Sequence, residues 1–163
     1  MIFVTLGTHE QPFNRLIKEI DELRAAGTVT EEVVVQTGYS TYEPASCTSR
    51  KLFGYDEMVA NMEKARIIIT HGGPSSFLQP LQMGKIPVVV PRQKAFGEHV
   101  NDHQVDFCRK VYDRYKNIIV VEDIATIKDV ILNYDDMVGS MPGGIKSNNA
   151  AFVENFKKIV DEL

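Results

Sequence analysis

Residues 67–92, IIITHGGPSSFLQPLQMGKIPVVVPR, contain two apolar runs that enclose a glycine-rich turn and a short helical pattern. The first run ends at His71, and Gly72, Gly73, Pro74 and two serines follow it. The second run begins after Gly84 and ends at Pro91-Arg92. A continuous apolar run bounded by turn residues is typical of a strand that is buried on both faces of a sheet. The stretch therefore predicts a strand, a helix and a second, parallel strand.

The rest of the chain repeats this alternation of strands and helices. We expect strands at 2–7, 31–38, 66–73, 86–92 and 117–123, with a short additional strand at 51–55. We expect helices at 12–27, 55–65, 75–84, 103–116, 124–137 and 148–163. Residues 39–50 read as a polar loop, and a Gly/Pro/Ser linker precedes the last helix. The pattern predicts an α/β protein, with residues 1–163 forming a single Rossmann-like, doubly wound parallel sheet.

Composition narrows the functional classes. The 163 residues are 44% hydrophobic and 25% charged, as expected for one globular domain, and the net charge of −4 argues against broad nucleic-acid binding. Cys47 and Cys108 lie far apart and have no metal-ligand spacing, which fits a reduced, cytoplasmic protein. Met1 leads directly into a strand pattern, so we expect no signal peptide, and the apolar runs are too short to span a bilayer.

Polar residues and glycines gather where the predicted strands end. Ligands of doubly wound sheets bind outside the carboxyl ends of the strands, so we expect the site there. We expect all four histidines at this edge of the sheet: His9, His71, His99 and His103.

The Gly72-Gly73 turn allows two interpretations, a ligand-binding one and a purely structural one. Glycines let the backbone approach a ligand, and the N-terminus of a helix starting near Ser75 would attract a diphosphate. Ser75 or Ser76 could then cap the helix or donate to a phosphate oxygen. Alternatively, the segment is only a turn and a helix cap. The segment is not a Walker A loop, since no Lys follows at the required spacing, and the first strand-to-helix turn, GTHEQP at residues 7–12, lacks the GxGxxG dinucleotide fingerprint.

The histidines also leave alternatives open. His9 is either a general base or a residue that packs the loop. His99 and His103 have the spacing of a zinc pair, but Val100 stands where the zinc motif has Glu, and Asn101 or Asp102 reads as the cap of the following helix.

The stretches ITHGGPSSFLQPLQMGKIPVVVPR and GEHVNDHQ, together with IFVTLGTHEQPFNRLIKEID, resemble the C-terminal domain of family 28 glycosyltransferases. The chain resembles most the single-domain catalytic subunits of split, two-subunit UDP-sugar transferases, of the bacterial capsule and exopolysaccharide type and of the dolichol-pathway N-acetylglucosaminyltransferase type. The resemblance implies half of a GT-B fold that binds a UDP-sugar donor.

The resemblance also implies residue roles. His9 would be the catalytic base. The expected donor-binding residues are Gly7, Thr8, His71, Gly72, Gly73, Ser75, Ser76, Gln79, Arg92, Glu98, Asn101, Asp102, His103 and Gln104. Gln79 stands where the family usually has a ribose-binding Glu. No metal and no cofactor other than the co-substrate are implied.

The implied reaction is inverting transfer of galactose, glucuronic acid or N-acetylglucosamine to a lipid-linked saccharide acceptor in polysaccharide biosynthesis. The implied partner is a membrane-anchored, acceptor-binding subunit that recruits this chain to the membrane face; alone, the chain could form homo-oligomers. The apolar stripe of residues 148–163 would dock on that partner or pack back on its own sheet. The basic run at 109–116 would meet phosphate groups or form a solvated helix face. The alternatives are a non-catalytic UDP-sugar-binding regulatory subunit and a two-histidine metal hydrolase.

Overall fold

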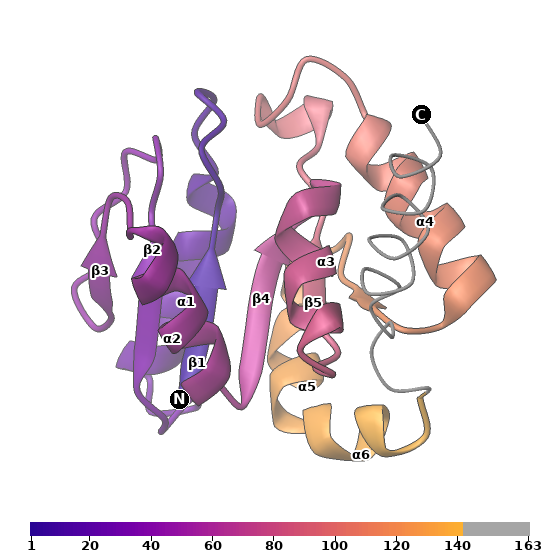
Figure 1. The fold of residues 1–163 in the computed structure, drawn as a ribbon. Coiled ribbons are helices and arrows are strands. Elements are labelled where there is room, and N and C mark those ends of the chain that lie inside the picture. Colours follow the sequence, from indigo (N-terminus) through magenta and orange to yellow (C-terminus); the bar gives the residue numbers. More distant parts are fainter. Residues whose placement is uncertain (142–163) are drawn as a thin grey trace, which may run out of the picture.

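The computed structural model describes residues 1–141, which form a parallel sheet covered by helices on both faces (Figure 1). The strands of the sheet are β1 (Ile2–Thr5), β2 (Val33–Gln36), β3 (Thr48–Arg50), β4 (Ile67–His71), β5 (Val88–Val90) and β6 (Ile119–Val120). The helices are α1 (Asn14–Ala25), α2 (Tyr55–Lys64), α3 (Pro74–Gln82), α4 (His103–Tyr115), α5 (Ile127–Leu132) and α6 (Tyr134–Gly139).

The six strands lie in the order β3-β2-β1-β4-β5-β6, and every pair is parallel. The chain winds outward from β1 in one direction and then returns to place β4 on the other side of β1. The predicted doubly wound, Rossmann-like α/β fold is therefore confirmed. The reversal between β1 and β4 is the topological switch point, where this type of sheet opens a crevice for ligands.

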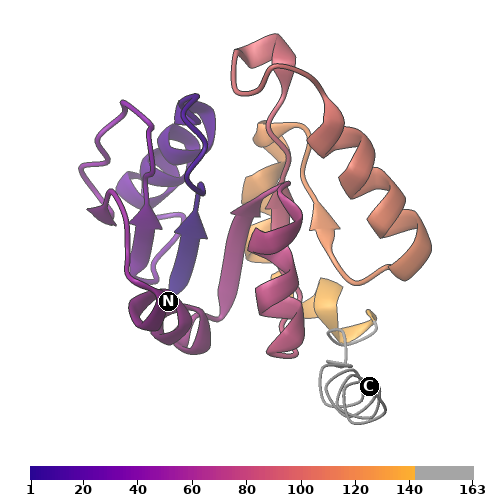
Figure 2. The ribbon, with the colours of Figure 1, turned by 45° about the horizontal axis from the view of Figure 1, so that its top comes forward.

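Side-chain alternation along the strands supplies a core on each face of the sheet. Ile2 and Val4 of β1 face a cluster that contains residues of α1 and α5, whereas Phe3 between them packs with Met62 of α2 on the other face. Helices α3 and α4 cover that second face beyond β4, where Phe77 of α3 packs in a third cluster. Figure 2 shows helices on both sides of the strands. Burial on both faces explains why the strands read as continuous apolar runs.

Two expected elements differ in the structure. The short strand lies at Thr48–Arg50, inside the expected loop, and not at 51–55. All three of its residues are exposed, so it is held by backbone pairing with β2 and carries no apolar pattern. The expected helix 124–137 is divided at Asn133, whose side chain donates to the Asp129 carbonyl at 2.8 Å. The predicted C-terminal helix, 148–163, lies outside the described residues.

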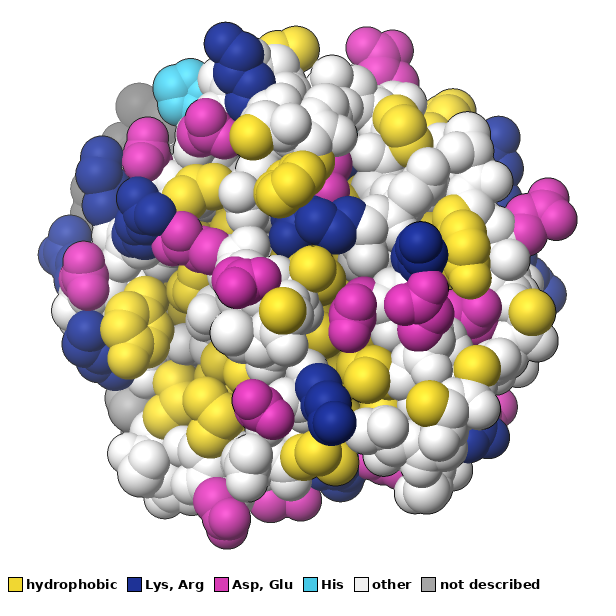
Figure 3. Space-filling model, turned by 180° about the vertical axis from the view of Figure 1, so that it is seen from behind, with side chains coloured by type: hydrophobic (Ala, Val, Ile, Leu, Met, Phe, Trp, Pro, Cys, Tyr) yellow, Lys and Arg dark blue, Asp and Glu magenta, His cyan; other side chains and the backbone are white. Residues whose placement is uncertain are grey.

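Figure 3 shows the face of the molecule that points away from the viewer in Figure 1. Basic and acidic side chains alternate on this face, and hydrophobic side chains lie in small groups between them. Among residues 1–141, no helix combines the length and the apolar character that crossing a bilayer requires.

Candidate donor-binding site

A crevice of about 580 Å³ opens at the carboxyl ends of β1 and β4, at the switch point of the sheet. Its volume falls within the range of about 300–1,000 Å³ that is usual for small-molecule sites. It is lined by Thr5, Gly7, Thr8, His9, Gln36, Met58, Met62, His71, Ser75, Ser76, Gln79 and Gln104.

More than half of the site residues that the sequence predicts line this crevice. The predicted residues that line it are Gly7, Thr8, His9, His71, Ser75, Ser76, Gln79 and Gln104. Gly72 and His103 instead line a separate hollow between the starts of α3 and α4, which Gln104 also borders. Asn101 and Asp102 form the turn before α4: the Asn101 side chain accepts from the His103 N–H, and that of Asp102 accepts from the Lys94 N–H.

Gly7 lines the crevice and Gly73 does not, but both glycines make room for a histidine. A Cβ at Gly7 or at Gly73 would collide with the imidazole ring of His71. A Cβ at Gly72 would meet the Gln104 side chain at 2.9 Å. We expected the Gly-Gly turn to leave space for a ligand, whereas the structure fills the space beside these glycines with side chains of the protein itself.

Part of the hydrogen-bonding capacity of the turn is also used internally. The Gly72 N–H donates to Gln104 Oε1 at 3.0 Å, and the Gly73 N–H donates to His71 Nδ1 at 3.0 Å. Helix α3 begins at Pro74 with Gly73 as its N-cap, one residue earlier than expected, and neither serine side chain caps it. The Ser76 hydroxyl donates to the Gly73 carbonyl at 2.6 Å. Exposed Ser75 remains beside the helix N-terminus, where an anion is favoured.

His71 is a neutral hydrogen-bond donor in this crevice. Burial, together with the nearby Arg92 guanidinium, lowers the pKa of His71 to about 4. Because Nδ1 accepts the Gly73 N–H, the ring proton lies on Nε2. A neutral imidazole that donates from Nε2 and an exposed serine at a helix N-terminus form a set of donors suited to a diphosphate.

His9 and His99 come together although they lie on different loops. Their rings stack with centroids 4.8 Å apart and an angle of 18° between the ring planes. Burial, and secondarily the neighbouring His9, lowers the pKa of His99. His9 Nε2 also lies 2.9 Å from Gln11 Oε1. Three of the four histidines thus gather at the switch point, and His103 lies apart.

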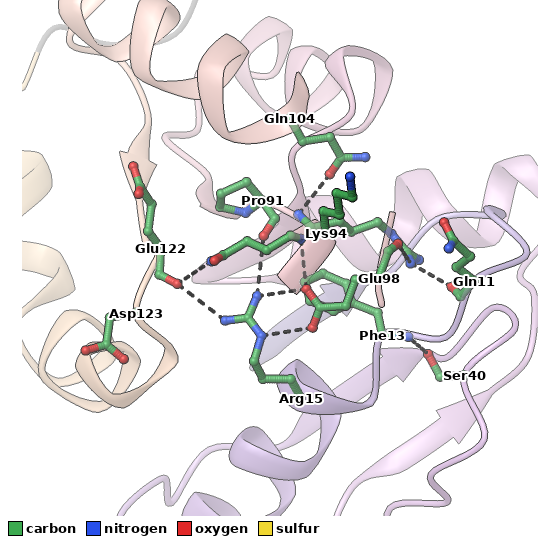
Figure 4. A network of polar contacts seen from close by, with 12 residues as sticks. Gln11, Phe13, Arg15, Ser40, Pro91, Lys94, Glu98, Gln104, Glu122 and Asp123 are labelled. Carbon is green, nitrogen blue, oxygen red and sulfur yellow. Dashed lines mark hydrogen bonds and ion pairs between the residues drawn. The ribbon is translucent and has the colours of Figure 1, made fainter. Parts of the chain in front are cut away.

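Arg92 and Glu98 do not border the crevice as expected. Their side chains are buried, with 1% and 2% of their surface exposed. The Arg92 guanidinium donates to backbone carbonyls. Glu98 accepts two hydrogen bonds from Arg15, at 2.9 and 3.0 Å (Figure 4). The polar groups of both side chains are thus directed into the protein, because the loop 91–102 folds back over α1.

Sequence reasoning missed four lining residues. Thr5 and Gln36 end their strands, and the Gln36 amide donates to the Thr5 hydroxyl at 3.1 Å. A polar residue closing an apolar strand was a signal that could have identified both. Met58 and Met62 come from α2, and the rule that ligands lie at strand ends gives no reason to select them.

The zinc-pair hypothesis finds no support in the arrangement of the described residues. His99 stacks on His9, whereas His103 begins α4 and lines the other hollow. Within residues 1–141, no three His, Cys, Asp or Glu side chains are grouped as metal ligands.

A larger groove, of about 900 Å³, lies away from the crevice, between α4, β6 and α6. It contains none of the predicted site residues, but it includes Arg109 and Lys116 of the basic run. Arg109 donates to both carboxylate oxygens of Glu122, at 2.7 and 2.6 Å, so its charge is already paired. We therefore assign the site to the smaller crevice at the switch point.

A doubly wound sheet with polar donors gathered at its switch point defines a domain of the nucleotide-binding type. The sequence model of the glycosyltransferase family 28 C-terminal domain matches residues 1–163. The chain belongs to this family.

Two relatives carry the same name, UDP-N-acetylglucosamine transferase subunit ALG13. The protein of Yarrowia lipolytica is 29% identical over 72 residues, which cover 44% of this chain and 34% of that protein. The protein of Homo sapiens is 31% identical over 120 residues, which cover 68% of this chain and 10% of that protein. The matched region thus spans about a third of one relative and a tenth of the other.

Two solved structures share the fold. The glycotransferase of kitacinnamycin aligns with a TM-score of 0.57 at 20% identity, over 86% of this chain and 35% of that one. The glycosyltransferase SnogD of Streptomyces nogalater aligns with a TM-score of 0.50 at 21% identity, over 86% of this chain and 39% of that one. In both, this fold forms part of a longer chain.

Proposed function

We propose that this chain is the catalytic, donor-binding subunit of an inverting UDP-hexose glycosyltransferase. The observation that carries the proposal is the switch-point crevice, where neutral His71, Ser75 and the N-terminus of α3 converge. These groups donate hydrogen bonds without a formal positive charge. Together they would hold the diphosphate of a UDP-sugar and stabilise the charge that grows on it as UDP leaves.

The reaction proposed is a single displacement at the anomeric carbon. The acceptor oxygen forms a bond to that carbon while the bond to the UDP oxygen breaks, and the acceptor proton moves to a base. His9 lines the crevice and is the base that we propose in this chain. The transfer requires no resident cofactor in this scheme, and a chelator would test for a metal.

The printed name of the relatives supports the choice of donor and the proposal of a partner. The name of the ALG13 relatives makes UDP-N-acetylglucosamine the first donor to test, with UDP-galactose and UDP-glucuronic acid as the alternatives. That name also describes a subunit, which supports the proposal of a second, acceptor-binding chain. We propose that this partner is membrane-anchored, that residues 148–163 dock on it, and that the pair acts on a lipid-linked saccharide at the cytoplasmic membrane face.

Calorimetric titration of the chain with UDP and the three UDP-sugars, with and without EDTA, tests the donor site. We expect UDP to bind, one sugar to be preferred and EDTA to have no effect. His71→Asn should weaken UDP binding at least tenfold, whereas His103→Asn, in the separate hollow between the starts of α3 and α4, should leave it unchanged. Equal binding by both variants would contradict the placement of the diphosphate. Binding without turnover in the presence of the co-expressed partner would favour a regulatory subunit instead.

A further inference from the structure

Arg92 is a fully buried cation, and no carboxylate among residues 1–141 pairs with its guanidinium. Its Nη1 donates to the carbonyl oxygens of Gln11 at 2.6 Å and of Glu98 at 3.1 Å, and its Nη2 donates to the Leu6 carbonyl at 2.9 Å. Its Nε is buried without a partner among the described residues. Burial lowers the pKa of Arg92 to about 10, so the group remains charged at neutral pH.

The three carbonyls belong to two loops that are distant in sequence. Leu6 and Gln11 flank the loop after β1, and Glu98 belongs to the loop after β5. The first loop carries His9 and the second carries His99, which directly follows Glu98. One planar guanidinium therefore ties together the two loops whose imidazole rings stack.

Gln11 extends this connection to the side chain of His9. Its backbone carbonyl accepts from Arg92, and its side-chain oxygen lies 2.9 Å from His9 Nε2. An amide oxygen can only accept, so the neutral His9 ring carries its proton on Nε2. Nδ1 is then the nitrogen with a free lone pair.

The loop after β5, which carries His99, is also held by the side chain of Glu98. The Glu98 carboxylate accepts from Arg15 (Figure 4). It also accepts from the Gln93 N–H at 3.0 Å. These contacts fix the residue that directly precedes His99.

We propose that Arg92 and Gln11 are positioning residues that hold His9 against His99 as the Nε2-protonated tautomer and leave Nδ1 as the atom that accepts the acceptor proton. The inference rests on the proposed role of His9 as the base. It assigns Arg92 to the geometry of the base, although the sequence suggested that Arg92 contacts the donor. It also adds Gln11, which no motif identified.

Nuclear magnetic resonance of the ¹⁵N-histidine-labelled chain tests the proposal without turnover. In the wild type we expect His9 to be protonated on Nε2 when neutral and to show a ring-to-ring Overhauser effect with His99. Gln11→Met, which keeps the length of the side chain but removes the acceptor, should abolish that effect. Gln11→Glu, which keeps the acceptor, should retain it.

Arg92→Lys tests the guanidinium itself, because an ammonium group cannot reach three carbonyls with the same fork. We expect the folded variant to lose the contact between His9 and His99, while the His103 resonances do not move. If this variant fails to fold, the two Gln11 variants decide. Nδ1 protonation in the wild type, or an unchanged His9–His99 contact in Gln11→Met, would overturn the proposal.

Calorimetry separates this proposal from the proposed function. UDP affinity should stay within twofold in Gln11→Met, while transfer in the complete two-subunit enzyme falls at least tenfold and its pH profile shifts. If wild-type chain and complex bind no UDP, the proposed function fails, whereas the resonance measurements still decide the tautomer and the contact. Transfer by Gln11→Met at the wild-type rate would overturn the positioning role of Gln11.

Discussion

His71 Nδ1 accepts a hydrogen bond from the backbone N–H of Gly73 at 3.0 Å, so the histidine that ends β4 is locked onto the turn that it precedes. A Cβ on Gly73 would collide with the same ring. The turn, the ring and the start of α3 therefore form one unit, and a change at Gly73 has to move His71.

Alanine at Gly73 should disable the donor site and leave the domain folded. The φ of −72° at Gly73 suits any residue, so the added methyl group acts through its contact with His71 and not through backbone strain. We expect at least a tenfold loss of UDP affinity by calorimetry, with the circular dichroism spectrum unchanged. Wild-type UDP affinity in Gly73→Ala would show that His71 does not hold the donor.

Gly7 and Gly27 form a matched pair that tests the close approach of Gly7 to the His71 ring. Both have positive φ, +73° and +72°, but a Cβ on Gly7 meets His71, whereas no described residue lies within 4 Å of a Cβ on Gly27. Gly27→Ala should cost only the left-handed strain of about 1–2 kcal/mol in the free energy of unfolding. Gly7→Ala should cost more and also weaken UDP binding. Equal costs in denaturant titration would contradict the contact with His71.

The stability of the domain should depend on pH through His71. Its pKa falls from 6.5 to about 4 on folding, chiefly through burial. Above pH 6.5 the ring is neutral in both states and has no effect; as the pH falls toward 4, the unfolded chain gains the proton and the folded chain does not. The free energy of unfolding should fall across this window, by roughly 3 kcal/mol at most, and then level off for this group.

Urea titrations of wild type and His71→Asn at a series of pH values isolate this effect. The acidic groups with lowered pKa, such as Glu31, also lose their contribution at low pH, but they do so in both proteins. The difference between the two curves should therefore slope only between about pH 6.5 and 4. A constant difference would mean that His71 titrates normally in the fold.

The strands were predictable because of where they lie. β1, β4 and β5 are buried on both faces and appear as apolar runs, and the turn residues between them mark the helices. β3 was not predictable in this way, because Thr48–Arg50 are exposed at the sheet edge and are held by backbone bonds that any sequence can make.

The candidate site was predictable where a general rule applied. Gly7, His9 and His71 follow strands, and the carboxyl ends of parallel strands meet at one edge. Burial of Arg92 and Glu98 was not predictable, because charged residues are usually exposed and the contact that holds Glu98 comes from Arg15, 83 residues away. Such a pairing leaves no local signal in the sequence.

Asp21 anchors the loop after β2, and its removal should destabilise the domain. This carboxylate is 4% exposed and accepts from the N–H groups of Ala45 at 3.0 Å and Ser46 at 2.7 Å and from the Tyr42 hydroxyl at 2.9 Å. Asp21→Ala leaves these donors unpaired, so we expect a loss of about 2–4 kcal/mol in urea titration. Exposed Glu22 is the control, and Glu22→Ala should stay within about 0.5 kcal/mol of wild type.

The adjacent serines at the start of α3 should separate binding from stability. The Ser76 hydroxyl donates to the carbonyls of Gly73 at 2.6 Å and His71 at 3.1 Å, so Ser76→Ala should lower the free energy of unfolding by about 1 kcal/mol.

Ser75 is exposed at the crevice, and its hydroxyl makes no hydrogen bond among the described residues. Ser75→Ala should therefore leave stability unchanged and weaken UDP binding about tenfold, the cost of one hydrogen bond to a charged group. Denaturant titration and calorimetry on the two variants give both quantities, and a loss of stability without a loss of affinity in Ser75→Ala would remove Ser75 from the donor site.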